Sequence, residues 1–260
     1  MSERSVIADR RKQILSYISQ HRAVEVTELM EIFNTTESTI RRDLIELEKT
    51  NLIIRTHGGA IRNEQKKSIW QTSSLTNRLE RNKEAKERIA AFTASLIHDS
   101  ESIFIDGGST TQILAEHLKN KENMLFVTNA LDISQILLES ETNTTILIGG
   151  QVAKDTHLTI GPDAEAHIKK YYVDKCILGV TGLDPEIGCY AAIPEEASVK
   201  RLMMEHARET ILVVDSTKFS RKAFCIAFPV EGINTVITDS NVPKEIADRL
   251  REKGIKVEIV

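Results

Sequence analysis

Short apolar runs recur at intervals through the sequence from residue 102 onwards, and most are separated by segments with helical periodicity. Strands that are buried on both faces are continuously apolar, because helices cover both sides of the sheet. The runs lie at residues 102–105, 124–127, 145–148, 175–178, 210–214 and 235–238, with helical segments at 113–118, 133–138, 199–207 and 245–253. This alternation predicts an α/β domain, with residues 255–260 as an edge strand.

Small and polar residues follow these runs, where ligands bind in open α/β sheets. The loops are Asp106-Gly107-Gly108-Ser109-Thr110-Thr111, Thr128-Asn129, Gly149-Gly150, residues 179–182 from Gly179 onwards, and Asp215-Ser216-Thr217-Lys218. Free N–H groups and hydroxyls at a helix N-terminus bind phosphate, and residues 109–111 are expected there. One such loop is usually only a turn, but five in series favour a phosphorylated small molecule as ligand.

A chain of 260 residues is too long for one small domain and suggests about two domains. It has no run of 18 apolar residues, and its N-terminus lacks the apolar segment of a signal peptide, so we expect a cytoplasmic protein with no membrane partner. Cys176, Cys189 and Cys225 are widely spaced and are expected to be reduced thiols. The histidines have no metal-ligand spacing, so neither a metal nor a cofactor is expected.

Residues 37–49 have the pattern of an amphipathic helix, with Ile40, Leu44 and Leu47 on one apolar stripe. Thr36 is a favourable N-cap residue. The opposite face carries Ser38, Thr39, Arg41 and Arg42. Hydroxyls and guanidinium groups on one exposed helix face suit the major groove of DNA, where arginine binds guanine edges or phosphates.

The neighbouring segments predict a winged helix. A second amphipathic helix runs upstream from Val26 and ends near Asn34, and downstream a strand at 52–55 is followed by His57-Gly58-Gly59 and a second strand. These glycines tolerate positive φ. The alternative is a small helical bundle with solvated arginines, but the hairpin directly after the helix favours DNA binding.

The residues of this region resemble the signature of the DeoR family of bacterial transcription regulators, which are mostly repressors. The resemblance rests on Thr39-Ile40-Arg41-Arg42-Asp43-Leu44, Leu47-Glu48 and Arg55-Thr56-His57-Gly58-Gly59-Ala60. It implies contacts with double-stranded operator DNA. The candidate DNA-binding residues are Thr36, Ser38, Thr39, Arg41, Arg42, Arg55, His57 and Gly58.

The resemblance extends to the C-terminal part, because the family's sensor domain is similar to ribose-5-phosphate isomerase and typically binds a sugar phosphate. Matching motifs are 106–111, Thr128-Asn129, Gly149-Gly150, Glu195-Glu196-Ala197, Val199-Lys200-Arg201, and Asp215 with Lys218-Phe219. Departures at Ala153 and at 189–194 are expected to affect contacts with the sugar. The candidate effector-binding residues are Asp106, Gly107, Gly108, Ser109, Thr110, Thr111, Thr128, Asn129, Gly149, Gly150, Gly179, Glu196, Asp215 and Lys218.

Charge is distributed unequally along the chain. Residues 1–88 contain 17 Lys and Arg against 13 Asp and Glu, whereas residues 89–260 contain 17 against 25, so the basic excess lies at the end that is expected to contact phosphates. A first helix at 7–18 is expected to face Arg10, Arg11 and Lys12 outwards, towards solvent or phosphate. Val24 and Val26 suggest a short strand that joins the wing sheet.

These patterns predict three parts: a winged helix-turn-helix domain at 1–62, a linker at 63–76 that contains Trp70, and an α/β sensor and oligomerisation domain at 77–260 that begins with a long helix at 76–98. We expect a repressor of sugar metabolism genes that a phosphorylated sugar controls and that forms at least a homodimer, because helix-turn-helix proteins bind paired half-sites. One alternative is an isomerase-like enzyme tethered to DNA, with Glu196 as base, and another is a carbohydrate-binding module. Binding without catalysis is favoured.

Overall fold

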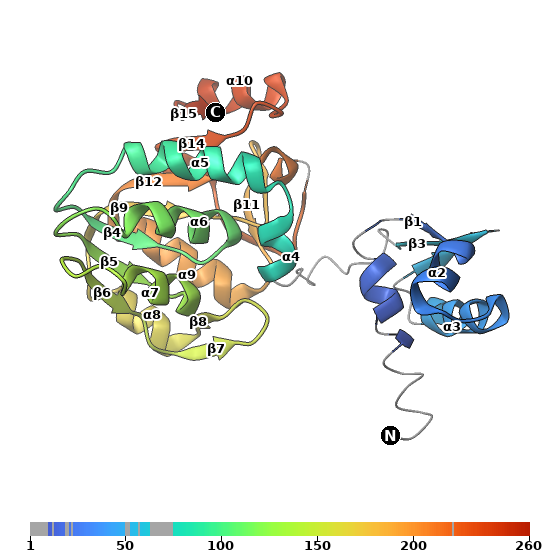
Figure 1. Ribbon diagram of the computed structural model, residues 1–260. Helices are drawn as coiled ribbons and strands as arrows, with labels where there is room; N and C mark the ends of the chain where they lie inside the picture. The colour runs from blue at the N-terminus through green and yellow to red at the C-terminus, as the bar shows by residue number, and fades with distance from the viewer. Residues whose placement is uncertain are drawn as a thin grey trace. The chain divides into compact units, whose positions relative to one another are not determined.

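The computed structural model of the chain describes residues 10–11, 13–18, 21, 23–49, 53–56, 58–62, 75–219 and 221–260. The chain divides into two compact units, Met1–Ser68 and Ile69–Val260 (Figure 1). Trp70 and most of the expected linker lie outside the described residues, and residues 75–76 already belong to a helix. No helix in the described ranges is long and apolar enough to cross a membrane.

The N-terminal unit is a helix-turn-helix followed by a β-hairpin, which confirms the predicted winged architecture. Residues 10–11 and 13–18 are helical. The elements that follow are β1 (Ala23–Glu25), α2 (Val26–Phe33), α3 (Glu37–Lys49), β2 (Ile53–Arg55) and β3 (Gly59–Arg62). The strands form an antiparallel sheet in the order β1-β3-β2, so the short strand predicted at 24–26 does join the wing, although Val26 begins α2.

Two small residues shape this unit. Asn34 adopts the left-handed conformation with φ 43° and ends α2, where the predicted helix ends. Gly59 is needed for close approach of two strands, because a Cβ at this position would lie 1.9 Å from the carbonyl oxygen of Val24. Neither Gly58 nor Gly59 is among the described residues with positive φ, so the expected reason for the glycines is wrong.

The C-terminal unit is built on a seven-stranded parallel sheet in the order β15-β14-β12-β9-β4-β5-β6. These strands are β4 (Ser102–Ile105), β5 (Leu125–Thr128), β6 (Thr144–Leu147), β9 (Val173–Leu178), β12 (Ala207–Val213), β14 (Thr235–Thr238) and β15 (Lys256–Ile259). Each corresponds to a predicted apolar run, with ends shifted by up to a few residues. The predicted last strand is an edge strand.

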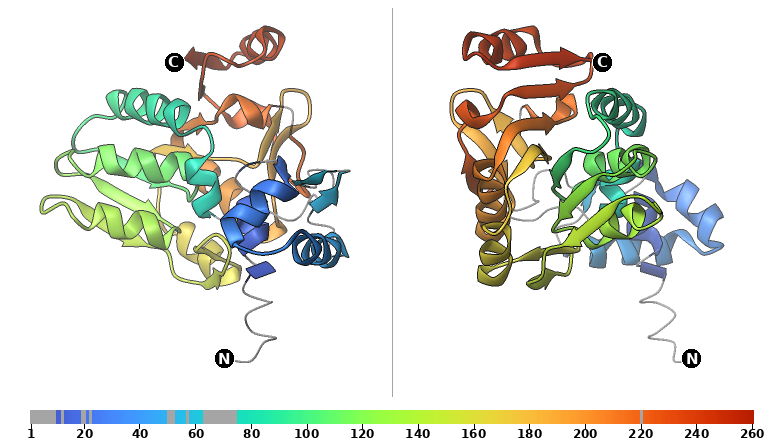
Figure 2. Two further views of the ribbon diagram at one scale, coloured as in Figure 1. Left: turned by 45° about the vertical axis from the view of Figure 1, so that its right-hand side comes forward. Right: turned by 90° about the vertical axis from the view of Figure 1, so that its left-hand side faces the viewer.

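Helices cover both faces of this sheet (Figures 1 and 2). Side chains of β4, β5, β9, β12 and β14 alternate between two cores. The core under α5, α6 and α7 includes Ile103 and Ile105, whereas the core under α8, α9 and α10 includes Phe104. The helices are α4 (Leu75–Glu80), α5 (Lys83–Ser95), α6 (Ser109–Leu118), α7 (Leu131–Leu137), α8 (Pro162–Ile168), α9 (Pro194–Glu205) and α10 (Lys244–Glu252), with 3₁₀ turns η2 (Ser216–Lys218) and η3 (Val230–Gly232).

The structure corrects the prediction of one long helix at 76–98. Asn82, with φ 54°, separates α4 from α5, and its side-chain amide donates to Asp215 at 3.0 Å. The buried Lys86 ammonium donates to the carbonyl of Arg78 and, at 2.5 Å, to that of Arg81, at the end of α4.

Two small antiparallel sheets and α8 were not predicted. A hairpin joins β7 (Gln151–Ala153) to β8 (Leu158–Ile160), and β10 (Gly182–Asp184), β11 (Gly188–Ala191) and β13 (Cys225–Phe228) form a three-stranded sheet. The three cysteines are free thiols.

Candidate functional site

The exposed face of α3 is the first candidate site. Ile40, Leu44 and Leu47 are buried in the core of the N-terminal unit, as predicted. Ser38, Arg41 and Arg42 are exposed on the other side, and Thr39 is half-buried. The carbonyl of Thr36 accepts hydrogen bonds from the N–H groups of Thr39 and Ile40, both at 3.0 Å, so Thr36 begins the helix. Its hydroxyl lies 2.9 Å from that of Thr39.

The arginines of this surface differ in their partners. Arg41 pairs with Glu37 at 2.7 Å, and the Arg55 guanidinium lies 3.7 Å from the Glu48 carboxylate. Arg42 is exposed and makes no ion pair with a described residue. Of the three arginines Arg41, Arg42 and Arg55, Arg42 is therefore the most available to another molecule.

The wing contributes Gly58 to this surface. Gly58 is exposed, and its carbonyl accepts a hydrogen bond from the N–H of Val26 at 2.9 Å, which fixes the start of α2 against the hairpin. His57 lies outside the described residues.

Arg10 and Arg11 do not simply face outwards, which corrects the prediction. Each places its Nε 2.7 Å from a different carboxylate oxygen of Asp43, whose side chain is only 2% exposed. A buried carboxylate needs such partners because its desolvation is costly. The two arginines therefore hold α3 in place, while Lys12 lies outside the described residues.

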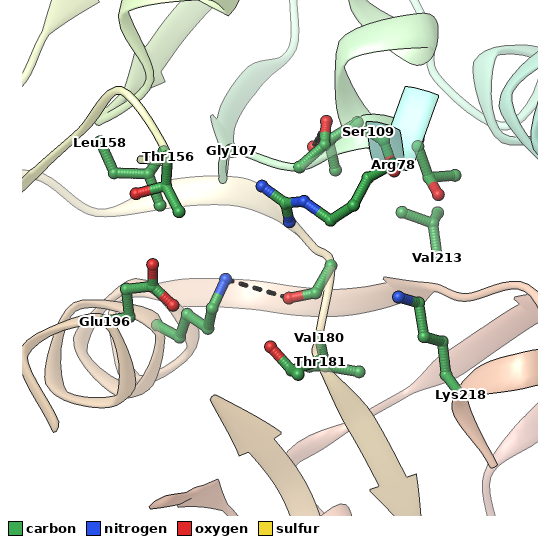
Figure 3. A pocket seen from close by; sticks show the side chains of 15 residues that line it. Arg78, Gly107, Ser109, Thr156, Leu158, Val180, Thr181, Glu196, Val213 and Lys218 are labelled. Carbon is green, nitrogen blue, oxygen red and sulfur yellow. Dashed lines mark hydrogen bonds between the residues drawn. The ribbon is translucent and has the colours of Figure 1, made fainter. Parts of the chain in front are cut away.

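The second candidate site is a cavity at the carboxyl ends of the central strands β4, β9 and β12. The chain places β5 and β6 on one side of β4, and β9, β12, β14 and β15 on the other. Ligands of open α/β sheets bind at such a switch point. The cavity is lined by Arg78, Gly107, Gly108, Ser109, Thr110, Thr111, Thr156, Leu158, Gly179, Val180, Thr181, Glu196, Lys200, Val213 and Lys218 (Figure 3).

The loop after β4 leads directly into the first turn of α6. A Cβ on Gly107 would lie 2.0 Å from a methyl carbon of Leu158, so any larger residue would force the Leu158 side chain to move. The carbonyl of Gly108 accepts the Gln112 N–H at 2.8 Å and the Thr111 hydroxyl at 3.1 Å. The first N–H groups of a helix have no partner within it. This turn therefore presents backbone donors to the cavity, together with the Ser109 and Thr110 hydroxyls.

Two partly buried cations, Lys218 and Arg78, line the cavity with these donors. Burial lowers the pKa of Lys218 to about 8, although the Asp215 carboxylate opposes this, and Arg221 and Arg78 add to the lowering. Burial also lowers the pKa of Arg78, whose Nε is buried without a partner among the described residues. Several partly buried cations close together, one of them with an unpaired donor, are a physical basis for binding an anion.

Acidic groups lie behind and beside the cavity. Lys200 pairs with Asp106, and both side chains are almost fully buried. The same ammonium donates to the Gly179 carbonyl at 3.0 Å. Burial raises the pKa of Glu196, and the Lys200 charge opposes this. In Figure 3 Glu196 lies at one side of the cavity and Lys218 at the other.

The cavity unites some of the sequence candidates and not others. Gly107 to Thr111, Gly179, Glu196 and Lys218 line it. The candidates that do not line it are Asp106, which binds Lys200; Asp215, which binds Asn82 and Thr217; Thr128 and Asn129, which bond backbone atoms; and Gly149 and Gly150 after β6. Ala153 and residues 189–194 do not line it either.

Sequence reasoning missed several lining residues. Lys200 could have been found, since it lies four residues after Glu196 and therefore on the same face of a helix. Arg78 comes from α4, and Thr156 and Leu158 come from the unpredicted β7–β8 hairpin, so the sequence held no clear signal for them. No group of three or more potential metal ligands occurs in the described part of the chain.

Comparison with known proteins agrees with this organisation. A model described as "DeoR-like helix-turn-helix domain" matches residues 10–66, and one described as "DeoR C terminal sensor domain" matches residues 81–240. The glycerol-3-phosphate regulon repressor of Escherichia coli (strain K12) is 33% identical over 251 residues, which cover 96% of this chain and 98% of that protein. The HTH-type transcriptional repressor GlcR of Bacillus subtilis (strain 168) is 31% identical, covering 94% and 93%.

Among solved structures, ribose 5-phosphate isomerase A from Methanocaldococcus jannaschii has a TM-score of 0.40 and 16% identity, covering 54% of this chain and 56% of that chain. That likeness is too remote to bear on function. The close relatives are named repressors and not enzymes. Both domain matches and the full-length relatives show that this chain belongs to the DeoR family and is a transcriptional repressor.

Proposed function

We propose that this repressor binds double-stranded operator DNA through α3 and the wing, and that a phosphorylated sugar in the cavity of the C-terminal unit controls this binding. The observation that carries the effector proposal is the meeting of the α6 N-terminal turn with Lys218 and Arg78. Backbone N–H groups and two partly buried cations suit a phosphate better than any neutral ligand.

The proposed DNA contacts come from the exposed side of α3. Ser38, Arg41 and Arg42 reach base edges or phosphates, Thr36 and Thr39 contact the backbone at the helix start, and Arg55, His57 and Gly58 belong to the wing. The exposure of Arg42 supports its place in the groove. The protein acts in the cytoplasm as at least a dimer, because two half-sites require two copies of α3.

In the proposed effector site, the loop from Gly107 to Thr111 holds the phosphate together with Lys218 and Arg78. Gly179 and Glu196 face the sugar. Asp106, Thr128, Asn129, Gly149, Gly150 and Asp215 act indirectly by holding the loops and side chains that line the cavity.

The effector changes operator affinity only if it binds one of two conformations more tightly. The test is a thermal-shift screen of sugar phosphates, followed by operator affinity with and without the best binder for wild type, Thr110→Val and Lys218→Ala. A ligand that binds the native state raises the melting temperature. We expect both variants to bind operator DNA normally and to lose the response.

A parallel loss of melting temperature and DNA binding in both variants would show a structural role for the loop. Variants that fold, bind DNA and respond normally would show that the effector binds elsewhere. Ala153→Ser is a matched control, because Ala153 lies on the hairpin strand and does not line the cavity.

A further inference from the structure

The two sides of the cavity differ in chemistry. Lys218 interacts with the charges of Asp215, Arg221, Arg78 and Lys86, so positive charge is concentrated around it. Thr156 and Glu196 lie together on the opposite side in Figure 3. A ligand that places phosphate beside Lys218 therefore presents its remaining atoms to Thr156 and Glu196.

Thr156 has a buried hydroxyl that makes no hydrogen bond of ordinary geometry with a described residue. The residue is 8% exposed, it lines the cavity, and its Oγ1 is buried. This hydroxyl lies close enough to the Glu196 carboxylate to oppose the rise of its pKa, but no hydrogen bond of ordinary geometry joins the two. A buried hydroxyl without a partner is costly, so this atom is suited to a group that arrives with the ligand.

The β7–β8 hairpin, which carries Thr156, is held in place by hydrogen bonds to the loop after β5. The Asn129 carbonyl accepts the Thr159 N–H at 2.7 Å, and the Asn129 amide donates to the Thr159 carbonyl at 3.2 Å. The Leu131 N–H donates to the His157 carbonyl at 3.1 Å, and Leu158 packs directly on Gly107. Thr156 is therefore held in a defined position, which a specific hydrogen bond requires.

We infer that Thr156 and Glu196 form the specificity-determining end of the effector site and read a hydroxyl that is remote from the phosphate. The ligand class is then a phosphate monoester of a polyol or sugar, bound with its phosphate towards Lys218 and its far hydroxyl towards the β7–β8 hairpin. Glu196 accepts a hydrogen bond from that hydroxyl, and the Thr156 hydroxyl donates to it or accepts from a neighbouring one. This inference rests on the proposed function.

The test compares two classes of probe on the wild type and on variants of Thr156 and Glu196. Calorimetry measures binding of inorganic phosphate, glycerol 3-phosphate, ribose 5-phosphate and glucose 6-phosphate to full-length wild type, Thr156→Val and Thr156→Ser. Valine keeps the shape of threonine without its hydroxyl, and serine keeps the hydroxyl. We expect Thr156→Val to weaken the best sugar phosphate about 5- to 10-fold, as for loss of one hydrogen bond, and to leave inorganic phosphate unchanged.

Thr156→Ser is expected to retain the affinity of the wild type for the sugar phosphate, and Glu196→Gln to weaken sugar phosphates more than inorganic phosphate. Melting temperatures of the ligand-free proteins control for folding. Equal weakening of both probe classes, or no effect of Thr156→Val on the best sugar phosphate, overturns this inference alone. Failure of every probe to bind the wild type overturns the proposed effector and this inference with it.

Discussion

The two units of the chain expose their cations to very different surroundings. On α3, Arg41 and Arg42 lie on an open surface where water already solvates them. In the cavity, Lys218 and Arg78 are largely removed from water, and burial lowers the pKa of both. The same residue types therefore serve recognition in two distinct ways.

This difference has an energetic consequence. A cation on an open surface hardly destabilises the free protein. It contributes to DNA binding through its position and through the release of counterions from DNA. A buried cation destabilises the free protein until an anion neutralises it. The cavity is thus suited to a small anion, which removes an electrostatic penalty when it binds, whereas α3 is suited to a large surface that shares the contact among many groups.

The largest effect is expected from breaking the buried ion pair between Lys200 and Asp106 at the cavity. Lys200→Met leaves the Asp106 carboxylate buried without its cation, and we expect the unfolding free energy of the C-terminal unit to fall by about 3–5 kcal/mol. The matched control is Lys175→Met, which breaks the pair with Glu101, whose side chain is 19% exposed. Denaturant unfolding measures both. Equal losses in the two variants would remove the distinction between a fully buried and a partly exposed ion pair.

A smaller effect is expected at the DNA surface. Arg42→Ala should weaken operator binding by about 1–3 kcal/mol if the guanidinium reads a base edge, and the fold should be unaffected because the side chain is exposed. Arg41→Ala is the matched control and should cost less, since Arg41 must first leave Glu37. Quantitative footprinting at one salt concentration compares them. A similar loss on operator and random DNA would assign Arg42 to phosphate, and an unchanged affinity would remove it from the interface.

The main sheet could be predicted from the sequence because its strands are buried on both faces. Residues 102–105 and 235–238 coincide with β4 and β14, because short apolar runs of this length are typical of strands buried on both faces. The β7 strand was missed because its residues are mostly exposed and show no apolar run. The break between α4 and α5 has only a weak local signal, the asparagine at position 82. It depends on Asn82 meeting Asp215, 133 residues away in the chain.

The residues of the cavity could be predicted only in part from the sequence, for a related reason. Sequence shows which loops follow strands but not the order of the strands in the sheet. Loops after β4, β9 and β12 meet because these strands are neighbours, whereas Gly149 follows the edge strand β6 and lies away from the switch point. Arg78 and Thr156 reach the cavity from α4 and from the hairpin, elements whose position only tertiary contacts determine.

The smallest effect is expected from the titration of Lys218, whose pKa burial lowers to about 8. Below pH 8 this lysine is charged, and above it the proton is lost, so binding of a phosphate dianion then requires proton uptake. Effector affinity should therefore be flat from pH 6.5 to about 7.5 and fall at higher pH by up to about tenfold per unit, or about 1.4 kcal/mol. Calorimetric titrations between pH 6.5 and 9.5 measure this slope.

The matched variant is Lys218→Arg, which keeps a positive charge throughout this range and should flatten the profile. Lys218 belongs to the proposed effector site and not to the proposed DNA surface, so operator affinity in the absence of effector should show no comparable slope over the same range. A slope that persists in Lys218→Arg would assign the proton to another group, of which Lys86, with a pKa that burial also lowers to about 8, is the nearest candidate. A flat profile in the wild type would mean that Lys218 does not contribute its charge to the phosphate, and the cavity would lose its main difference from the open surface of α3.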